Sequence, residues 1–263
     1  MSFESVTLHA GQVGSGSTTQ RAAQTHKGPN NWFYFCCAWL IAAVVIYGFA
    51  QTLSQNLLSA AIRRPLILWI HASVFFAWIA LFVLQTTLVR VRKLRWHRTF
   101  GVAILAVGAT MPLLGIATAL AMARFNVMHG FRDAVDVAAH LSIPFNDLIF
   151  FSAMLAAAAW WRRRPEVHSR LMLIATCLLT AAAFARFPFI TIEALRLYAG
   201  VDLLLLLGVT HDLIIRRRVH AVYAISLPLV LIGQSTAMWL FLARPHWWVE
   251  LMQRVLWLTR PLA

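Results

Sequence analysis

The stretch LILWIHASVFFAWIALFVLQTTLV, residues 66–89, decides the fold class of this chain. It contains no charged residue, and it is longer than the roughly 20 apolar residues that a helix needs to cross a bilayer core. His71 stands near its start, and Trp78 and Gln85 follow at steps of seven, so the three side chains share one helix face. We therefore expect a membrane-spanning helix with one partly polar face.

The rest of the chain repeats this apolar character. Of its 263 residues, 60% are hydrophobic and 12% are charged, whereas a soluble domain carries roughly 25% charged residues. This composition predicts an all-α, polytopic membrane bundle of about seven transmembrane helices. The expected spans are Trp32–Ala50, Leu66–Val89, Phe100–Ala123, Ala134–Trp161, Leu171–Ile192, Leu197–Ile215 and Ala221–Ala243.

Three segments follow from this division. Residues 1–31 are polar and rich in Gly, Ser and Thr, so we expect a disordered tail. Residues 32–243 form the transmembrane domain, in which Pro144 and Pro188 predict kinks. Residues 244–263 are too short and too polar to span, and they predict a helix lying in the membrane interface. Its expected apolar face holds Trp247, Trp248, Leu251, Val255 and Leu258.

The formal net charge of +14 is concentrated in short clusters between the apolar runs. This layout is typical of membrane topology signals and of contact with anionic lipid headgroups, and it argues against nucleic-acid binding. If the N-terminus is cytoplasmic and the C-terminus is outside, the basic loops lie on the cytoplasmic side of the membrane. We therefore expect this orientation in a bacterial inner (plasma) membrane.

Two parts of the chain look like copies of one helical hairpin. HASVFFAWIALF at 71–82 aligns with HLSIPFNDLIFF at 140–151, which places His71 on His140. With two extra residues allowed, His97 falls on His168. The predicted repeats cover about 66–123 and 134–192, and they would be related by a two-fold axis along the membrane normal.

Rotation about such an axis leaves the depth of a residue in the membrane unchanged. Equivalent histidines of the two repeats would therefore lie at the same depth. If the histidine faces point at the axis, His71 and His140 meet near the outer boundary, as in a bundle that clamps a b-type haem and its metal. His97 and His168 would form a second pair on the inner side. The alternatives are imidazoles bonded to neighbouring helices for the outer pair, and contacts with solvent or headgroups for the inner pair.

Other polar residues also fall within the expected spans. Asp147 follows His140 by seven residues on the same helix face, and His211 adjoins Asp212. Polar and ionisable residues at membrane depth are commonly functional. Asp202 lies near the outer end of its span, where we expect it to pair with Arg186 or Arg196. Gly101, Gly108 and Gly115 repeat every seven residues and predict a seam of close helix packing.

The layout of His71, His97, His140 and His168 across paired hairpins resembles the transmembrane diheme b-type cytochromes, which include ferric reductases. The junctions HRTFG (97–101) and EVHSRL (166–171) also resemble bacterial membrane proteins of unknown function that share this hairpin pattern. The resemblance implies haem b at both histidine pairs and a membrane oxidoreductase that passes electrons to an outer acceptor. Since the chain has no soluble domain for a nucleotide or flavin, the donor would be a quinone or another protein. Here, however, His97 and His168 are expected in basic loops rather than inside spans.

Two competing functions remain open on the sequence. The first is a proton-linked transporter, in which Asp147, Asp202, His140 and His211 line the proton path. The second is an accessory subunit of a larger complex, in which polar residues serve only helix contacts. A retinal protein is excluded because the only lysines, Lys27 and Lys93, lie outside the spans.

Overall fold

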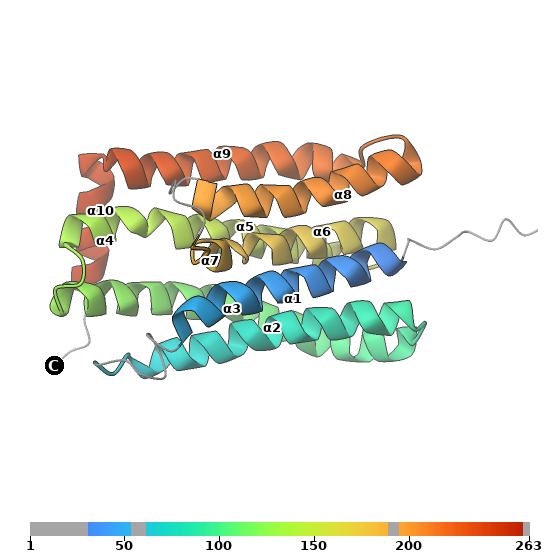
Figure 1. Ribbon diagram of the computed structural model, residues 1–263, viewed down its shortest axis with the longest axis horizontal. Coiled ribbons are helices and arrows are strands. Elements are labelled where there is room, and N and C mark those ends of the chain that lie inside the picture. The colour runs from blue at the N-terminus through green and yellow to red at the C-terminus, as the bar shows by residue number, and fades with distance from the viewer. Residues whose placement is uncertain (1–30, 54–61, 189–194, 260–263) are drawn as a thin grey trace, which may run out of the picture.

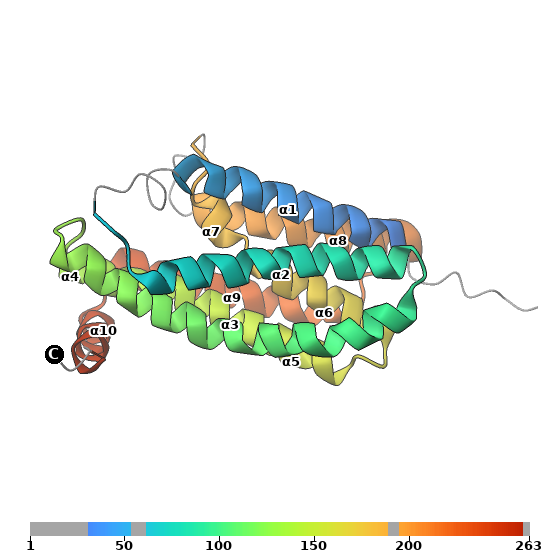
Figure 2. The same ribbon diagram turned by 90° about the horizontal axis from the view of Figure 1, so that it is seen from below.

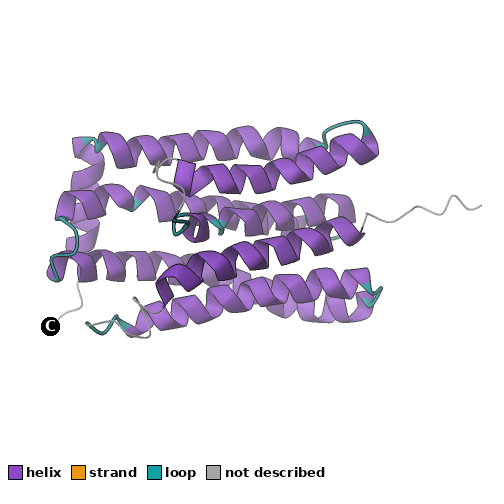
Figure 3. Ribbon diagram, viewed as in Figure 1, coloured by secondary structure: helices purple, strands orange, loops and turns teal. Residues whose placement is uncertain are grey.

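The computed structural model describes residues 31–53, 62–188 and 195–259 (Figure 1). Within these ranges the regular structure is helical and no strand occurs (Figure 3). Seven segments are long and apolar enough to cross a membrane, so the predicted all-α, seven-helix membrane bundle is confirmed. The N-terminal tail predicted to be disordered covers residues 1–31. Of these, residues 1–30 lie outside the described residues, and Asn31 is the first residue of α1.

The elements follow one another along the chain as ten α-helices and one π-helical segment among the described residues. They are α1 (Asn31–Leu53), α2 (Leu66–Arg90), α3 (Leu94–Met128), α4 (Ala134–His140), α5 (Ser142–Trp160), α6 (Pro165–Leu178), α7 (Ala181–Phe184), η2 (Leu195–Ala199), α8 (Gly200–Arg216), α9 (Ala221–Ala243) and α10 (His246–Leu258).

The fourth predicted span is two helices rather than one. α4 ends at His140 and α5 begins at Ser142, four and two residues before Pro144. In a continuous helix the proline ring would clash with the carbonyl group four residues back, which is that of His140. The hydroxyl of Ser142 lies 2.9 Å from the carbonyl oxygen of Ala139 and 2.8 Å from that of Ala237 on α9. The break is therefore held against α9 by a buried polar contact.

Two predicted spans begin earlier than expected. α3 starts at Leu94 instead of Phe100, and α6 starts at Pro165 instead of Leu171. Proline is well suited to the first position of a helix because no intrahelical bond needs its missing N–H. The basic residues at these helix starts can keep their charges in the interface while their stems cover apolar surface. The predicted end of the fifth span, Ile192, lies outside the described residues.

The two predicted hairpins are both present. α2 packs along α3, α5 packs along α6, and α3 joins the pairs by packing on α5 (Figures 1 and 2). α1 covers α2, α6 and α7, α9 covers α4 and α5, and α8 packs on α6. The loops 91–93, 161–164 and 217–220 lie at the end of the bundle where α1 begins (Figure 1). We call this the basic end.

Glycine in α3 allows close packing at the centre. A β-carbon at Gly108 would lie 2.7 Å from side-chain atoms of Trp78 and Leu155, and one at Gly115 would lie 2.8 Å from Leu148. Trp78 also meets Phe151 edge-on, with 5.5 Å between ring centres. The predicted glycine seam is confirmed at these two positions. It is wrong at Gly101, where nothing lies within 4 Å because this residue is beyond the helix crossing.

The C-terminal helix α10 crosses the opposite end of the bundle (Figure 1). It buries Val249 and Met252 against α3 and α4, and the indole of Trp248 donates a hydrogen bond to the carbonyl of Ala139 at 3.4 Å. The predicted helix is therefore present. Its predicted apolar face is partly wrong, because Trp248 and Val255 pack on the protein while Trp247, Leu251 and Leu258 remain exposed.

Gly48 allows α1 to approach α7. A β-carbon at this position would lie 2.4 Å from the backbone oxygen of Ala183, which cannot move without shifting α7. We expect Gly48→Ala to lower the free energy of unfolding by about 1–3 kcal/mol, the usual cost of overpacking. Thermal unfolding in detergent measures the effect.

The control is Gly101→Ala in α3, where a β-carbon meets nothing within 4 Å. Because alanine favours helix more than glycine does, this variant should unfold at the same temperature or slightly higher. Equal destabilisation by both substitutions would contradict the proposed α1–α7 contact.

Candidate functional site

Polar side chains gather at two places inside the bundle. One group lies nearer the α10 end and consists of Asn146, Asp147, Tyr198, Asp202 and Gln234. We call it the acid cluster. The other lies at the basic end and consists of Glu166, Arg170, His211, Asp212, Arg216 and His220. We call it the basic-end network.

The acid cluster begins on α5 with Asp147. The hydroxyl of Tyr198, on η2, donates a hydrogen bond to Oδ1 of Asp147 at 3.1 Å. The amide nitrogen of Asn146 lies 3.2 Å from the same carboxylate oxygen and 3.4 Å from the Tyr198 hydroxyl. Two neutral groups therefore hold this carboxyl group in place.

The second acid of the cluster is Asp202, one turn after Tyr198. It is an electrostatic neighbour of Tyr198, and Gln234 on α9 lies beside it. The side chains of Asp202 and Gln234 lie within hydrogen-bonding reach of each other, although Oδ1 of Asp202 and Nε2 of Gln234 are both buried without a hydrogen bond of regular geometry among the described residues. Tyr198 is thus hydrogen-bonded to a carboxyl group from α5 and lies one turn from a second carboxyl group on α8.

No arginine, lysine or histidine in the described part of the chain forms an ion pair with Asp147 or Asp202. The predicted partner Arg186 instead donates to Thr52 at 3.0 Å and to the carbonyl of Ala182, and its guanidinium covers the ring of Phe49. The side chain of Arg196, the other predicted partner, lies outside the described residues. A carboxylate without a cation is costly in hydrocarbon, so such a group is stabilised by a proton or a small cation.

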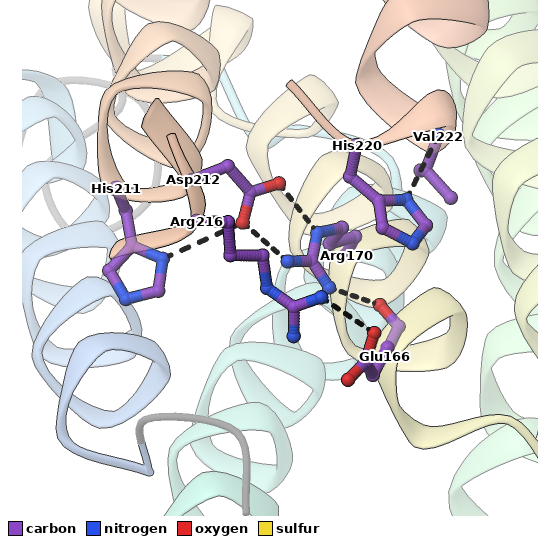
Figure 4. A network of polar contacts seen from close by, with 7 residues as sticks. All are labelled: Glu166, Arg170, His211, Asp212, Arg216, His220 and Val222. Carbon is purple, nitrogen blue, oxygen red and sulfur yellow. Dashed lines mark hydrogen bonds and ion pairs between the residues drawn. The ribbon is translucent and has the colours of Figure 1, made fainter. Parts of the chain in front are cut away.

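The basic-end network is centred on an ion pair between α6 and α8 (Figure 4). Nε of Arg170 donates to Oδ2 of Asp212 at 2.8 Å, and a second guanidinium nitrogen donates to Oδ1. The two side chains are 2% and 1% exposed. Arg170 also donates to the backbone oxygen of Glu166 at 2.6 Å, and Arg216 pairs with the Glu166 carboxylate at 2.7 Å. The buried charges of Arg170 and Asp212 are therefore paired with each other, as a structural ion pair requires.

Two histidines border the network. His211 lies 3.8 Å from Asp212 and stacks on Phe33 of α1, with 3.9 Å between ring centres. Nδ1 of His220 accepts a hydrogen bond from the backbone N–H of Val222 at 3.2 Å and so caps α9. Burial, assisted by the charge of Arg170, lowers the pKa of His220. This favours the neutral imidazole that can accept the capping bond.

His97 and His168 are electrostatic neighbours, and each is the fourth residue of its helix, α3 and α6 respectively. The expectation that they lie in loops is therefore wrong, because both helices begin earlier than predicted. Their predicted pairing stays a prediction. Nδ1 of His168 is 2.8 Å from the carbonyl of Ala158, which leaves Nε2 available. The backbone of Gln85 lies beside His97, and the Gln85 side chain is buried without a partner among the described residues.

His71 and His140 have different surroundings. His71 stacks on Phe75 at 4.0 Å and has Arg186 as its electrostatic neighbour. His140 meets Phe241 edge-on at 5.3 Å, and its electrostatic neighbours are Arg132 and Asp136. No contact between these two histidines occurs in the described ranges. Their predicted pairing across a haem stays a prediction. No group of three or more His, Cys, Asp or Glu that could hold a metal occurs among the described residues.

Sequence reasoning found Asp147, Asp202 and His211 but missed three partners: Tyr198, Gln234 and Arg170. Gln234 carried a usable signal, because it is a polar residue in the middle of a span. Arg170 gave none, since it follows three arginines that do lie in a loop. No protein family model, curated protein or solved structure matches this chain. The functional argument therefore depends on the geometry of these residues.

The Arg170–Asp212 pair yields a stability prediction. Asp212→Leu leaves a buried guanidinium without its partner, which typically costs about 3–5 kcal/mol. The double variant Arg170→Met with Asp212→Leu removes both charges, and we expect it to recover most of the loss. Thermal unfolding of the purified variants measures both. A double variant as unstable as Asp212→Leu alone would contradict this account of the pair.

Proposed function

We propose that this protein is a proton-translocating membrane transporter, with Asp147 and Asp202 as the proton-carrying groups. One observation carries the proposal: the spans hold two carboxyl groups, Asp147 hydrogen-bonded to the Tyr198 hydroxyl and Asp202 one turn after Tyr198, and no described cation pairs with either. Intramembrane acids of this kind are typical of proton relays in transporters.

The helices around the acid cluster support this function. Asp147 lies shortly after the break between α4 and α5, and Tyr198 lies in the π-helical segment η2 that leads into α8. Interrupted helices commonly form the binding sites of transporters, and π-helical turns often mark functional sites. The cluster therefore forms beside a helix break in one of its segments and at a π-helical turn in another.

The chemistry of the cluster suggests how protons could drive a change of conformation. When both acids hold protons, Asp147, Tyr198 and Asp202 can pack as a neutral, hydrogen-bonded group. When the protons leave, two negative charges without a cation remain near one phenol in a medium that screens them poorly. Their cost would favour movement of α8 relative to α5.

The layout of charge supports an orientation. The three arginine-rich loops share the basic end with the start of α1 (Figure 1). By the positive-inside rule this end lies on the cytoplasmic side of a bacterial inner membrane, beside anionic headgroups. The acid cluster would then lie in the outer half of the bilayer, with the basic-end network below it.

Proton flux into liposomes tests the function. The purified protein is reconstituted around a pH-sensitive dye, and a potassium gradient with valinomycin imposes a membrane potential. We expect proton entry well above that of empty liposomes, and a fall of roughly tenfold or more in Asp147→Asn and in Asp202→Asn, as for loss of a proton-transfer group.

The control is Asp133→Asn, outside the spans, because asparagine caps a helix as well as aspartate does. It should carry protons at the rate of the original protein. If the original protein and Asp202→Asn differ in no way from empty liposomes, the proposed function is wrong.

A second candidate, electron transfer through haem b, is favoured by the proximity of His97 and His168. They come from different hairpins, and the Ala158 carbonyl beside Nδ1 of His168 is the kind of contact that orients a metal-ligating imidazole. When bound between them, a haem would supply one-electron chemistry, with a quinone or a protein as the donor. His71 and His140 fit a shared haem less well, because their neighbours differ.

The visible absorption spectrum of protein produced with added haem precursor tests this candidate. A Soret band with a reduced α-band, lost in His168→Ala and kept in His220→Ala, would support it. Absence of both bands would exclude haem and leave proton translocation as the account of the intramembrane polar groups.

A further inference from the structure

We infer that Tyr223 relays protons between the basic-end network and the acid cluster, and that Gly208 exists to admit its hydroxyl group. This inference rests on the proposed proton translocation and adds the residue through which the proton must pass.

Tyr223 is buried and its hydroxyl group is free to form a new hydrogen bond, as a proton relay requires. Its side chain is 1% exposed, and its hydroxyl group has no hydrogen-bond partner among the described residues. Buried hydroxyl groups normally find a partner, so an unpartnered one needs an explanation. A hydroxyl that exchanges protons in another conformation supplies it.

The hydroxyl group occupies a notch on α8. A β-carbon at Gly208 would lie 2.1 Å from the Tyr223 oxygen, so no other residue type leaves room for it. On its other sides Tyr223 has Tyr34 from α1, Arg170 from α6 and Asp212 from α8 as electrostatic neighbours. The phenol therefore reaches from the basic-end network to the backbone of α8.

The spacing of α8 places this notch between the two clusters. Gly208 follows Asp202 by six residues and precedes Asp212 by four, which corresponds to roughly 9 Å and 6 Å along the helix axis. α9 also runs from the basic end toward the acid cluster, and the buried residues along this path are Tyr223, Ser226, Val230 and Gln234. The last of them, Gln234, lies beside Asp202. A polar route from the basic end thus passes Tyr223 before it reaches the acid cluster.

An apolar layer closes this route in the present conformation. Leu205 and Val230 are each 1% exposed. Leu205 lies between Asp202 and Gly208 along α8, and Val230 lies between Ser226 and Gln234 along α9. This layer would keep water from joining the two clusters until α8 and α9 separate.

The proton transfer balances without an added reagent other than water. Once water enters, the phenol gives its proton to a water molecule on the Asp202 side and accepts one from a water molecule on the basic-end side. One O–H bond breaks, one forms, and Tyr223 remains neutral. Before the next proton can pass in the same direction, the hydroxyl hydrogen must rotate back toward the Asp202 side.

Tyr223→Phe in the same liposome assay tests the inference. We expect proton flux to fall roughly tenfold or more, while the unfolding temperature stays equal or rises because an unpartnered buried hydroxyl is removed. Gly208→Ala, which displaces the hydroxyl group, should lower flux as well. The matched control is Tyr47→Phe on α1, where the tyrosine is 44% exposed.

The outcomes separate the inference from the function on which it rests. If Asp202→Asn carries protons as fast as the original protein, the proposed function fails. If Asp202→Asn loses flux while Tyr223→Phe matches Tyr47→Phe, the relay alone is wrong. If Tyr223→Phe unfolds several degrees lower than Tyr47→Phe, the hydroxyl has a structural partner and the relay is again overturned.

Discussion

A polar group in hydrocarbon has no water to bind, and this constraint separates the polar residues of the bundle into two kinds. Arg170 and Asp212 satisfy each other with two hydrogen bonds and tie α6 to α8. Asp202 and Gln234 instead lie side by side without a hydrogen bond of regular geometry, and the buried Tyr223 hydroxyl group has no partner in the described residues. The first kind accounts for the fold, and the second kind points to the function.

The spans could be predicted because length and composition alone determine them. The break at Leu141 could only be placed approximately, since Pro144 disfavours helix over several preceding residues and tertiary contacts of Ser142 choose the point. Asp147 and Asp202 were recognisable as rare acids at membrane depth. Tyr198 and Arg170 were not, because a phenol or a basic residue near a span end usually needs no partner, and only packing shows otherwise.

The histidines show the limit of reasoning from a repeat. The alignment predicts two pairs, and the electrostatic neighbours are His97 and His168, the pair that was expected in loops. Their equal positions in α3 and α6 follow from the hairpin repeat. α1, by contrast, packs against α2 and α6 but has no counterpart in the repeat. His71, next to Arg186 of the segment that α1 contacts, therefore has surroundings unlike those of His140.

The two candidate functions use different helices, since the paired histidines lie on α3 and α6 and the acid cluster on α5, η2, α8 and α9. The most direct test of the central claim is infrared spectroscopy of the reconstituted protein during a pH titration. The account predicts a carbonyl band from protonated carboxyl groups that titrates in the original protein and is lost when Asp147→Asn and Asp202→Asn are combined. An identical titration in that double variant would contradict the claim that these acids hold the proton.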